Sequence, residues 1–181
     1  MAERKRAFTS REIAEAGIAI ALAFVLSMIK VYRLPMGGSI TAGSMIPILL
    51  LALRRGYKLG IVTAVLYGIV QIIEGAYIVH PAQAVLDYPL AFGALGLAGF
   101  FASRVGKTHF YAILGVIVGI IGRFVCHFLS GVIFFSEYAP EGMNPWTYSA
   151  LYNGSYILGE LIISVILIYL LVKKGVLELY R

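Results

Sequence analysis

Residues 110–135 read FYAILGVIVGIIGRFVCHFLSGVIFF, an apolar stretch that holds two basic side chains, Arg123 and His127. A second apolar stretch, Ala82–Ala102, holds the carboxyl group of Asp87. Both reach the length of about 20 residues that an α-helix needs to cross a bilayer. A charge at the bilayer centre costs roughly 2.5–3.5 kcal/mol on insertion scales, so a charge there usually has a function. We therefore expect membrane-spanning helices that enclose a polar site.

The composition of the whole chain is typical of a membrane protein. Its 181 residues are 60% hydrophobic and 13% charged, and its mean hydropathy is +0.89. Soluble domains have about 25% charged residues. The net charge of +6 does not indicate nucleic-acid binding, because Lys and Arg gather at the ends of apolar stretches. The single cysteine, Cys126, excludes a disulfide within the chain. We expect one transmembrane domain over residues 1–181.

The apolar stretches predict an all-α integral membrane protein with six transmembrane helices. Thr9 and Glu12 have the spacing of a capping box, which predicts where the first helix begins. The second and third stretches are the shortest, so they are expected to be tilted, kinked or incompletely spanning. The six predicted stretches are Ile13–Ile29, Ile40–Leu53, Leu59–Ile73, Ala82–Ala102, Phe110–Phe135 and Ser149–Val172.

The distribution of Lys and Arg predicts the orientation of these helices. Of the 15 such residues, twelve lie on the side of the N-terminus, two (Lys30 and Arg33) lie on the other side, and Arg123 lies within a helix. Cytoplasmic loops carry the excess of Lys and Arg, so both termini are expected in the cytoplasm. The outer side then receives the loops Lys30–Ser39 and Glu74–Pro81, and a third at Ser136–Tyr148.

Polar and aromatic side chains gather near the predicted outer face. Asp87 and His127 lie close to the outer ends of their helices, and Tyr148 and Asn153 begin the sixth. A carboxylate, an imidazole and an amide among aromatic rings suit a small, flat, partly cationic ligand. The rings at this level belong either to the site or to an interfacial aromatic belt. They are Tyr77, Tyr88, Phe134, Phe135, Trp146, Tyr152 and Tyr156.

The intramembrane charges are expected to pair with one another. Arg123 lies one helical turn from His127, on the same face. Its carboxylate partner is either Asp87 or Glu160, which lies at nearly the same depth as Arg123. If Arg123 pairs with Glu160, Asp87 is free for a ligand. A further polar stripe in the third helix is formed by Tyr67, Gln71 and Glu74.

Motifs of catalysis are absent from the sequence. There is no G-x-S-x-G, no H-E-x-x-H and no complete P-loop motif. We therefore expect no enzyme activity, no cofactor and no metal, and the energy for uphill transport would come from a partner or an ion gradient. The first helix carries Gly17-x-x-x-Ala21 and Ala19-x-x-x-Ala23, which let a helix approach closely. That helix belongs either to a partner protein or to this chain.

Over nearly its full length the chain resembles the thiamine-specific substrate-binding subunits (S components) of energy-coupling factor transporters. Each motif alone is common, whereas the set is specific. The motifs are Ala21-Leu22-Ala23-Phe24, Pro35-Met36-Gly37-Gly38-Ser39, Ile46-Pro47 through Arg54-Arg55-Gly56, Gly75-Ala76-Tyr77-Ile78, Gln83-Ala84 with Asp87-Tyr88, His127-Phe128 with Gly131-Val132-Ile133-Phe134, and Tyr148-Ser149-Ala150 with Asn153-Gly154.

The resemblance implies six helices in the bacterial plasma membrane and a thiamine site near the outer face, capped by the first loop. It also implies a membrane-embedded T subunit with two ATP-binding-cassette ATPases, which the small residues of the first helix would contact. The implied ligand is thiamine. The implied binding residues are Asp87, Tyr88, His127, Asn153, Tyr148, Arg123, Tyr77 and Phe135. Trp146 is added to this predicted site from the aromatic rings near the outer face.

Three positions depart from the family pattern, which has Glu, Lys and Trp where this chain has Asp87, Arg123 and Phe135. The cation-accepting chemistry is kept in all three. Alternative functions are an S component for another vitamin or a thiamine precursor, a stand-alone proton-coupled carrier with a relay of Asp87, Arg123 and Glu160, and an intramembrane enzyme that uses His127 and Asp87. Ser130 is the nucleophile nearest to His127 for such an enzyme.

Overall fold

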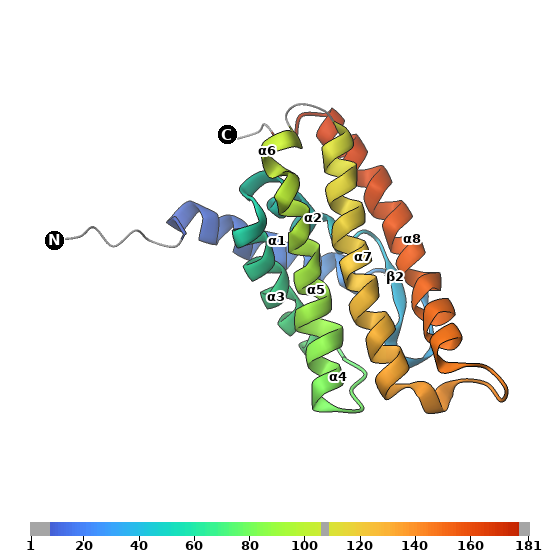
Figure 1. Ribbon diagram of the computed structural model, residues 1–181. Helices are drawn as coiled ribbons and strands as arrows, with labels where there is room; N and C mark the ends of the chain where they lie inside the picture. The colour runs from blue at the N-terminus through green and yellow to red at the C-terminus, as the bar shows by residue number, and fades with distance from the viewer. Residues whose placement is uncertain (1–7, 106–108, 178–181) are drawn as a thin grey trace.

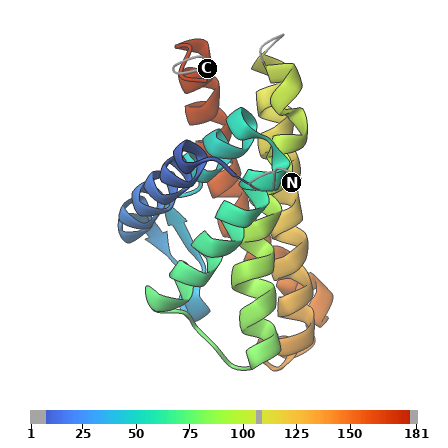
Figure 2. The ribbon, with the colours of Figure 1, turned by 90° about the vertical axis from the view of Figure 1, so that its left-hand side faces the viewer.

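The structure, a computed structural model, describes residues 8–105 and 109–177. Its helices are packed side by side in a bundle, and a two-stranded hairpin lies against α8 (Figures 1 and 2). The elements in chain order are α1 (Ser10–Met28), β1 (Lys30–Arg33), η1 (Pro35–Gly37), β2 (Ser39–Thr41), α2 (Ile46–Arg55), α3 (Tyr57–Ile73), α4 (Pro81–Val85), η2 (Leu86–Leu90), α5 (Ala91–Gly93), η3 (Ala94–Phe101), α6 (Ala102–Val105), α7 (His109–Phe134), η4 (Ser136–Tyr138) and α8 (Pro145–Lys173).

The predicted helical fold is confirmed, and the capping box at the start of α1 is present. The Thr9 hydroxyl accepts from the Glu12 backbone N–H, and the Glu12 carboxylate accepts from the Thr9 backbone N–H. These bonds satisfy two of the N–H groups that a helix start leaves unpaired. The helix therefore begins where the sequence predicted.

The second predicted stretch, Ile40–Leu53, is not one helix, so that prediction is wrong. Its first residues belong to β2, and α2 begins only at Ile46. Between them Gly43 adopts φ 91°, which turns the chain, and Pro47 occupies the first turn of α2. Ile40 packs on Gly159 and Thr41 is buried against Glu160, both in α8, so these residues do not begin a helix.

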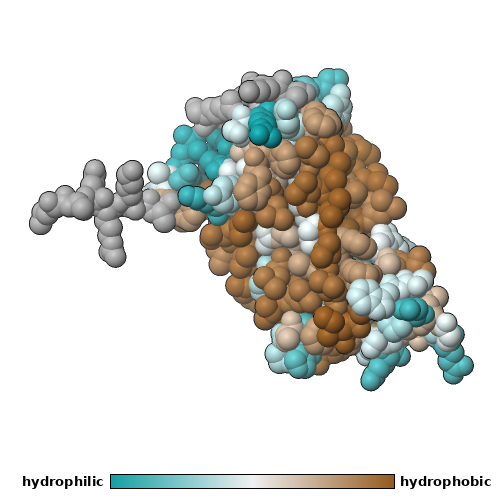
Figure 3. Space-filling view, viewed as in Figure 1, coloured by the Kyte–Doolittle hydropathy of each residue, from teal (hydrophilic) through white to brown (hydrophobic). Residues whose placement is uncertain are grey.

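Within residues 8–105 and 109–177, three helices are long and apolar enough to cross a membrane: Pro81–Val105, His109–Phe134 and Pro145–Lys173. The helix Tyr57–Ile73 is apolar but shorter. Figure 3 shows an apolar belt over this face of the molecule, with hydrophilic surface at both ends. The long helices lie along the direction from one hydrophilic end to the other (Figure 1), which is the arrangement that a bilayer requires.

The helical rod Pro81–Val105 contains a π-helical turn, η2, at the point where it carries Asp87. Pro89 lies inside this turn and has no backbone N–H to donate. The rod packs closely on α3, because a Cβ atom at Gly68 would lie 2.5 Å from the Tyr88 carbonyl oxygen. A Cβ atom at Gly96 would overlap the backbone of Ile61. The widened turn and the close packing fix the direction of the Asp87 side chain.

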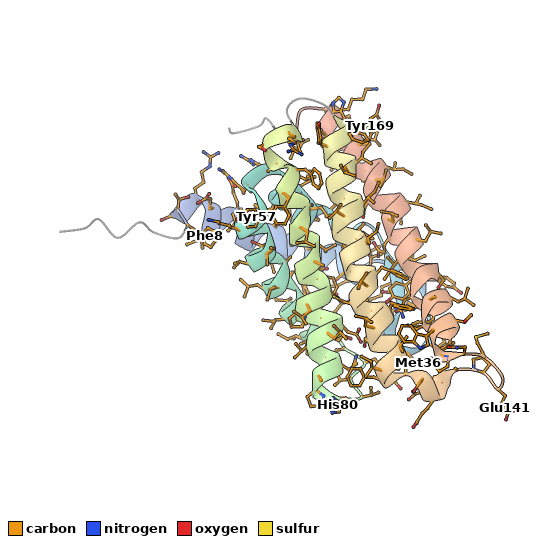
Figure 4. The ribbon with its side chains drawn as sticks, in the orientation of Figure 1. Phe8, Met36, Tyr57, His80, Glu141 and Tyr169 are labelled. Carbon is orange, nitrogen blue, oxygen red and sulfur yellow. The ribbon has the colours of Figure 1, made fainter. Side chains whose placement is uncertain are left out.

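The hairpin joins α1 to α2. Strands β1 and β2 are antiparallel, with Lys30 opposite Thr41 and Arg33 opposite Ser39. At the tip, Met36 adopts φ 59° and Gly37 φ 93°, and Met36 lies at the same end of the molecule as His80 and Glu141 (Figure 4). The loop that was predicted at residues 30–39 is therefore an ordered hairpin.

Candidate functional site

A pocket opens between the hairpin, the end of α3, the rod, α7 and α8. Eight of the nine predicted binding residues line it, and Trp146 does not. Trp146 is 55% exposed and packs on Phe128 at a ring distance of 5.7 Å. The eight lining residues are Asp87, Tyr88, His127, Asn153, Tyr148, Arg123, Tyr77 and Phe135.

Asp87 is the carboxylate at the centre of the lining. It is buried and accepts two hydrogen bonds on Oδ2, from Gln83 Nε2 at 2.6 Å and from Ser130 Oγ at 2.8 Å. Its Oδ1 atom lies 3.1 Å from His127 Nδ1. Three polar neighbours thus hold a carboxylate that faces the pocket. A buried carboxylate is costly without such partners.

His127 connects Asp87 to Arg123. Arg123 donates from Nε to His127 Nε2 at 3.2 Å, so Nε2 is the acceptor and Nδ1 carries the proton that points to Asp87. The guanidinium also lies 4.2 Å above the Phe92 ring and contacts Met45 Sδ at 2.8 Å. A chain of polar contacts therefore runs from Asp87 through His127 to Arg123 along one wall of the pocket.

The predicted pairing of Arg123 with a carboxylate is wrong within the part of the chain that the structure describes. Neither Asp87 nor Glu160 forms an ion pair with Arg123. Glu160 accepts hydrogen bonds from Thr41 and does not line the pocket. Asp87 thus forms no ion pair with Arg123 in the described structure, because His127 lies between them.

Asn153 joins α7 to α8. Its Nδ2 donates to the carbonyl oxygens of His127 at 3.2 Å and Ser149 at 3.1 Å, and its Oδ1 accepts from Tyr156 Oη at 2.9 Å. The donors of Asn153 are already used inside the protein, which leaves a lone pair of Oδ1 for a ligand. Gly131 lies beside this group, where a Cβ atom would overlap the Ser149 hydroxyl.

Aromatic rings close the mouth of the pocket. Tyr77 and Phe135 have ring centroids 6.1 Å apart, and Tyr138 lies 5.8 Å from Phe135. The hydroxyls of Tyr77 and Tyr138 are 3.3 Å apart, and the Tyr88 hydroxyl accepts from the Tyr77 backbone N–H. Of these residues, Tyr77, Tyr88 and Phe135 line the pocket, where their rings are faces on which a flat cationic heterocycle can stack. Phe135 thus presents a ring to the pocket.

The hairpin covers the pocket and is held at its tip by Tyr152. The Tyr152 hydroxyl donates to the Pro35 carbonyl oxygen and accepts from the Gly38 backbone N–H. Gly38 is required here, because a Cβ atom would lie 2.8 Å from that hydroxyl. Tyr152, assigned from the sequence to either a site or an aromatic belt, therefore contacts the hairpin.

The polar stripe predicted in the third helix faces α1 and Lys30, the first residue of the hairpin. Tyr67 and Gln71 lie in α3, and Glu74 directly follows it. Tyr67 donates to the Ala23 carbonyl oxygen and Gln71 donates to Ser27. Glu74 forms an ion pair with Lys30 at 2.8 Å and accepts from Ser27 at 2.7 Å. Burial raises the pKa of Glu74, but the bonds from Lys30 and Ser27 outweigh it, so the pKa lies below its usual value.

The structure separates the two small-residue patterns of α1. Ala19 and Ala23 are buried in the bundle, whereas Gly17 and Ala21 are exposed. A Cβ atom at Gly17 would have nothing within 4 Å. Ala19 and Ala23 therefore serve packing within this chain, which is one of the two alternatives that the sequence left open, the other being contact with a partner protein.

Sequence reasoning assigned no site role to Gln83 or Met36, and it gave Ser130 only an enzymatic one. Gln83 lies one turn before Asp87, and Ser130 lies one turn after His127. This i, i+3 and i, i+4 spacing was a usable signal. Met36 lines the pocket because of its left-handed backbone at the hairpin tip, which no sequence pattern indicates.

The chain is similar to known proteins in sequence and in fold. Residues 13–178 match the family described as Thiamine transporter protein (Thia_YuaJ). The Thiamine transporter ThiT of Bacillus subtilis (strain 168) is 38% identical over 169 residues, which are 87% of this chain and 88% of that protein. The Thiamine transporter ThiT of Lacticaseibacillus paracasei is 36% identical over 137 residues, 68% of each chain.

A solved structure of ThiT from Listeria monocytogenes superposes on this chain with a TM-score of 0.82. It is 32% identical in sequence, and the match covers 91% of this chain and 94% of that one. The family match spans most of the chain, and the relatives agree with it in sequence and in fold. The chain belongs to the thiamine transporter protein family.

Proposed function

We propose that this protein is the thiamine-binding subunit of an energy-coupling factor transporter. It captures thiamine at the outer face of the plasma membrane and delivers it inward together with a T subunit and two ATPases. The protein itself is not an enzyme, and ATP is hydrolysed by the partners. The family assignment supports thiamine as the substrate, and the pocket supplies the chemistry.

The observation that carries the proposal is the Asp87 carboxylate in a ring-lined pocket. Thiamine has a permanently cationic thiazolium, which a carboxylate balances and aromatic faces stabilise. Its aminopyrimidine ring offers both donors and acceptors, for which Asn153 and Tyr148 are proposed partners. The hydrogen bonds from Gln83 and Ser130 keep Asp87 oriented without neutralising its charge.

The proposed arrangement in the membrane has six crossings with both termini in the cytoplasm. The excess of Lys and Arg near the termini supports this direction. Helix α2 has ten residues, which rise about 15 Å, half of the roughly 30 Å hydrocarbon core. In the proposed arrangement the hairpin occupies the outer half of that crossing, and the pocket therefore opens outward.

The proposed surface for the T subunit is the exposed line of α1 that contains Gly17 and Ala21. Small residues allow a neighbouring helix to approach closely in lipid. Glu160 bonds to Thr41 and not to Arg123, so the described structure contains no continuous relay from Asp87 through Arg123 to Glu160. This observation argues against the stand-alone proton-coupled carrier.

The test is a calorimetric titration of the purified protein with thiamine, other B vitamins and the separate pyrimidine and thiazole precursors. We expect thiamine to bind at least hundredfold more tightly than any other vitamin. Uptake in cells should require the T subunit and both ATPases. Tight binding of a different vitamin, or uptake without the ATPases, would contradict the proposal.

A further inference from the structure

Glu160 is a buried carboxylate that the thiamine pocket does not use. It lies in the middle of α8, is 2% exposed, and is not among the residues that line the pocket. In the described part of the chain it forms no ion pair, and its Oε2 atom has no hydrogen-bond partner. Because burying a carboxylate is costly, its contacts indicate what it does there.

Both hydrogen bonds of Glu160 go to one residue of the hairpin. Its Oε1 atom accepts from the Thr41 backbone N–H at 2.6 Å and from the Thr41 hydroxyl at 2.7 Å. The Thr41 hydroxyl also contacts Ser44 Oγ at 2.9 Å, in the turn that leads into α2. Hydrogen bonds that satisfy a buried oxygen are costly to lose. Glu160 thus holds the end of β2 in place through two hydrogen bonds to Thr41.

Thr41 is the root of the hairpin. It pairs with Lys30, and the next residue, Ala42, donates its N–H to the Ile29 carbonyl oxygen at 3.0 Å. Residues 31–40, which lie between the paired residues Lys30 and Thr41, form the part of the hairpin that covers the pocket. A contact at the root therefore controls the direction in which the hairpin leaves the bundle.

The strand β2 follows α8 from the tip to the root (Figure 1). Gly38 bonds to Tyr152 at the tip, Ile40 fills the space above Gly159, and Thr41 bonds to Glu160 at the root. The strand β1 is mostly exposed, and its root residue Lys30 pairs with Glu74. The hairpin is thus fixed to α8 along one strand, and the Glu160 contact is its deepest polar point.

We propose that Glu160 is a positioning residue that holds the hairpin closed over the pocket through Thr41 and thereby slows the release of thiamine. This inference rests on the proposed function, because it assigns the hairpin and Glu160 a part in retaining that ligand. Glu160 acts at a distance, since it does not touch the pocket. Loss of the hydrogen bonds between Glu160 and Thr41 frees the hairpin root and leaves the residues that line the pocket in place.

The test compares Glu160→Ala, Glu160→Gln and the control Ser164→Ala. The Gln oxygen still accepts both bonds from Thr41, whereas Ala removes them. Ser164 lies one turn further along α8, is fully buried, and its hydroxyl has no hydrogen-bond partner in the described structure. The control thus removes a buried polar group from the same helix without touching the hairpin.

Two readouts are measured on purified protein in detergent. The first is hydrogen exchange of the amides of residues 30–42 without ligand, and the second is release of tritiated thiamine during a chase with unlabelled thiamine. For Glu160→Ala we expect hairpin exchange and thiamine release each about tenfold faster or more, from the loss of the two hydrogen bonds to Thr41. Exchange in α7 should be unchanged. Glu160→Gln and Ser164→Ala should stay within about threefold of the original protein.

Thr41→Val provides an independent variant if Glu160→Ala does not fold. It removes only the hydroxyl bond, so release should be faster by a smaller factor, and the double variant should release thiamine no faster than Glu160→Ala. Uniformly faster exchange in all helices, with thiamine release unchanged, would show that Glu160 is merely structural and would overturn the inference. If the original protein binds no thiamine, the proposed function is wrong. In that case the hydrogen exchange of the hairpin still tests whether Glu160 holds the hairpin root.

Discussion

Replacement of Asp87 by Asn removes the negative charge of this side chain from the pocket with little change in shape. The residue is 8% exposed, and its side chain is held by Gln83, Ser130 and His127. With an effective dielectric constant of about 20, a carboxylate about 5 Å from a cationic ring contributes roughly 3 kcal/mol. Partial compensation by solvent and by neighbouring dipoles reduces this value. We therefore expect thiamine affinity to fall between tenfold and about hundredfold, since each 1.4 kcal/mol is tenfold.

The assay is calorimetric titration of the Asp87→Asn protein with thiamine and with an uncharged analogue in which carbon replaces the thiazolium nitrogen. The substitution should weaken thiamine binding far more than binding of the neutral analogue, because only thiamine loses a charge–charge interaction. Asp87→Glu keeps the charge and restores the residue of the family pattern, so its affinity should stay within about fivefold. Thermal unfolding without ligand checks that Asn is tolerated beside Gln83. Equal weakening for both ligands, or unchanged thiamine affinity, would refute the electrostatic reasoning.

Three further results are expected. Gly96→Ala should destabilise the protein by roughly 1–3 kcal/mol in thermal unfolding, because its Cβ would overlap the α3 backbone, whereas the open position Gly17→Ala should not; equal effects would contradict this packing. Phe135→Ala should weaken thiamine about three- to tenfold by removing a ring face, and unchanged affinity would exclude it from the site. The contact of Glu74 with Lys30 stabilises the protein fully above about pH 4.5 and is lost as pH falls through the lower pKa of the folded state. Hairpin exchange should therefore rise in acid relative to Glu74→Gln, which lacks this titration; identical pH profiles would contradict it.

Much of the helical fold could be predicted because a membrane demands long apolar helices. The stretches around Asp87 and Arg123 are uninterrupted, and their helices are found at nearly the predicted residues. The hairpin could not be predicted, because Ile40 and Thr41 read as the start of an apolar helix. Thr41 is buried by its contact with Glu160 of α8, more than one hundred residues later in the sequence.

Contacts of the candidate site could be predicted where both side chains lie on the same face of one helix. Arg123 and His127 share a face at i, i+4 spacing, and they do contact each other. The partners of these charges depend on the relative rotation of different helices, which no spacing within one helix gives. For this reason the sequence paired Arg123 with a carboxylate, while the structure places His127 between Arg123 and Asp87. Trp146 was included for its chemistry, although it packs outside the pocket.

The central claim is that Asp87 and the surrounding rings hold the cationic ring of thiamine beneath the hairpin. The most direct test is a crystal structure of the protein grown with thiamine. We predict density for the thiazolium beside the Asp87 carboxylate and against Phe135, with the hairpin closed through Tyr152 and Glu160. Thiamine bound elsewhere, or bound with its cationic ring turned away from Asp87, would contradict this claim.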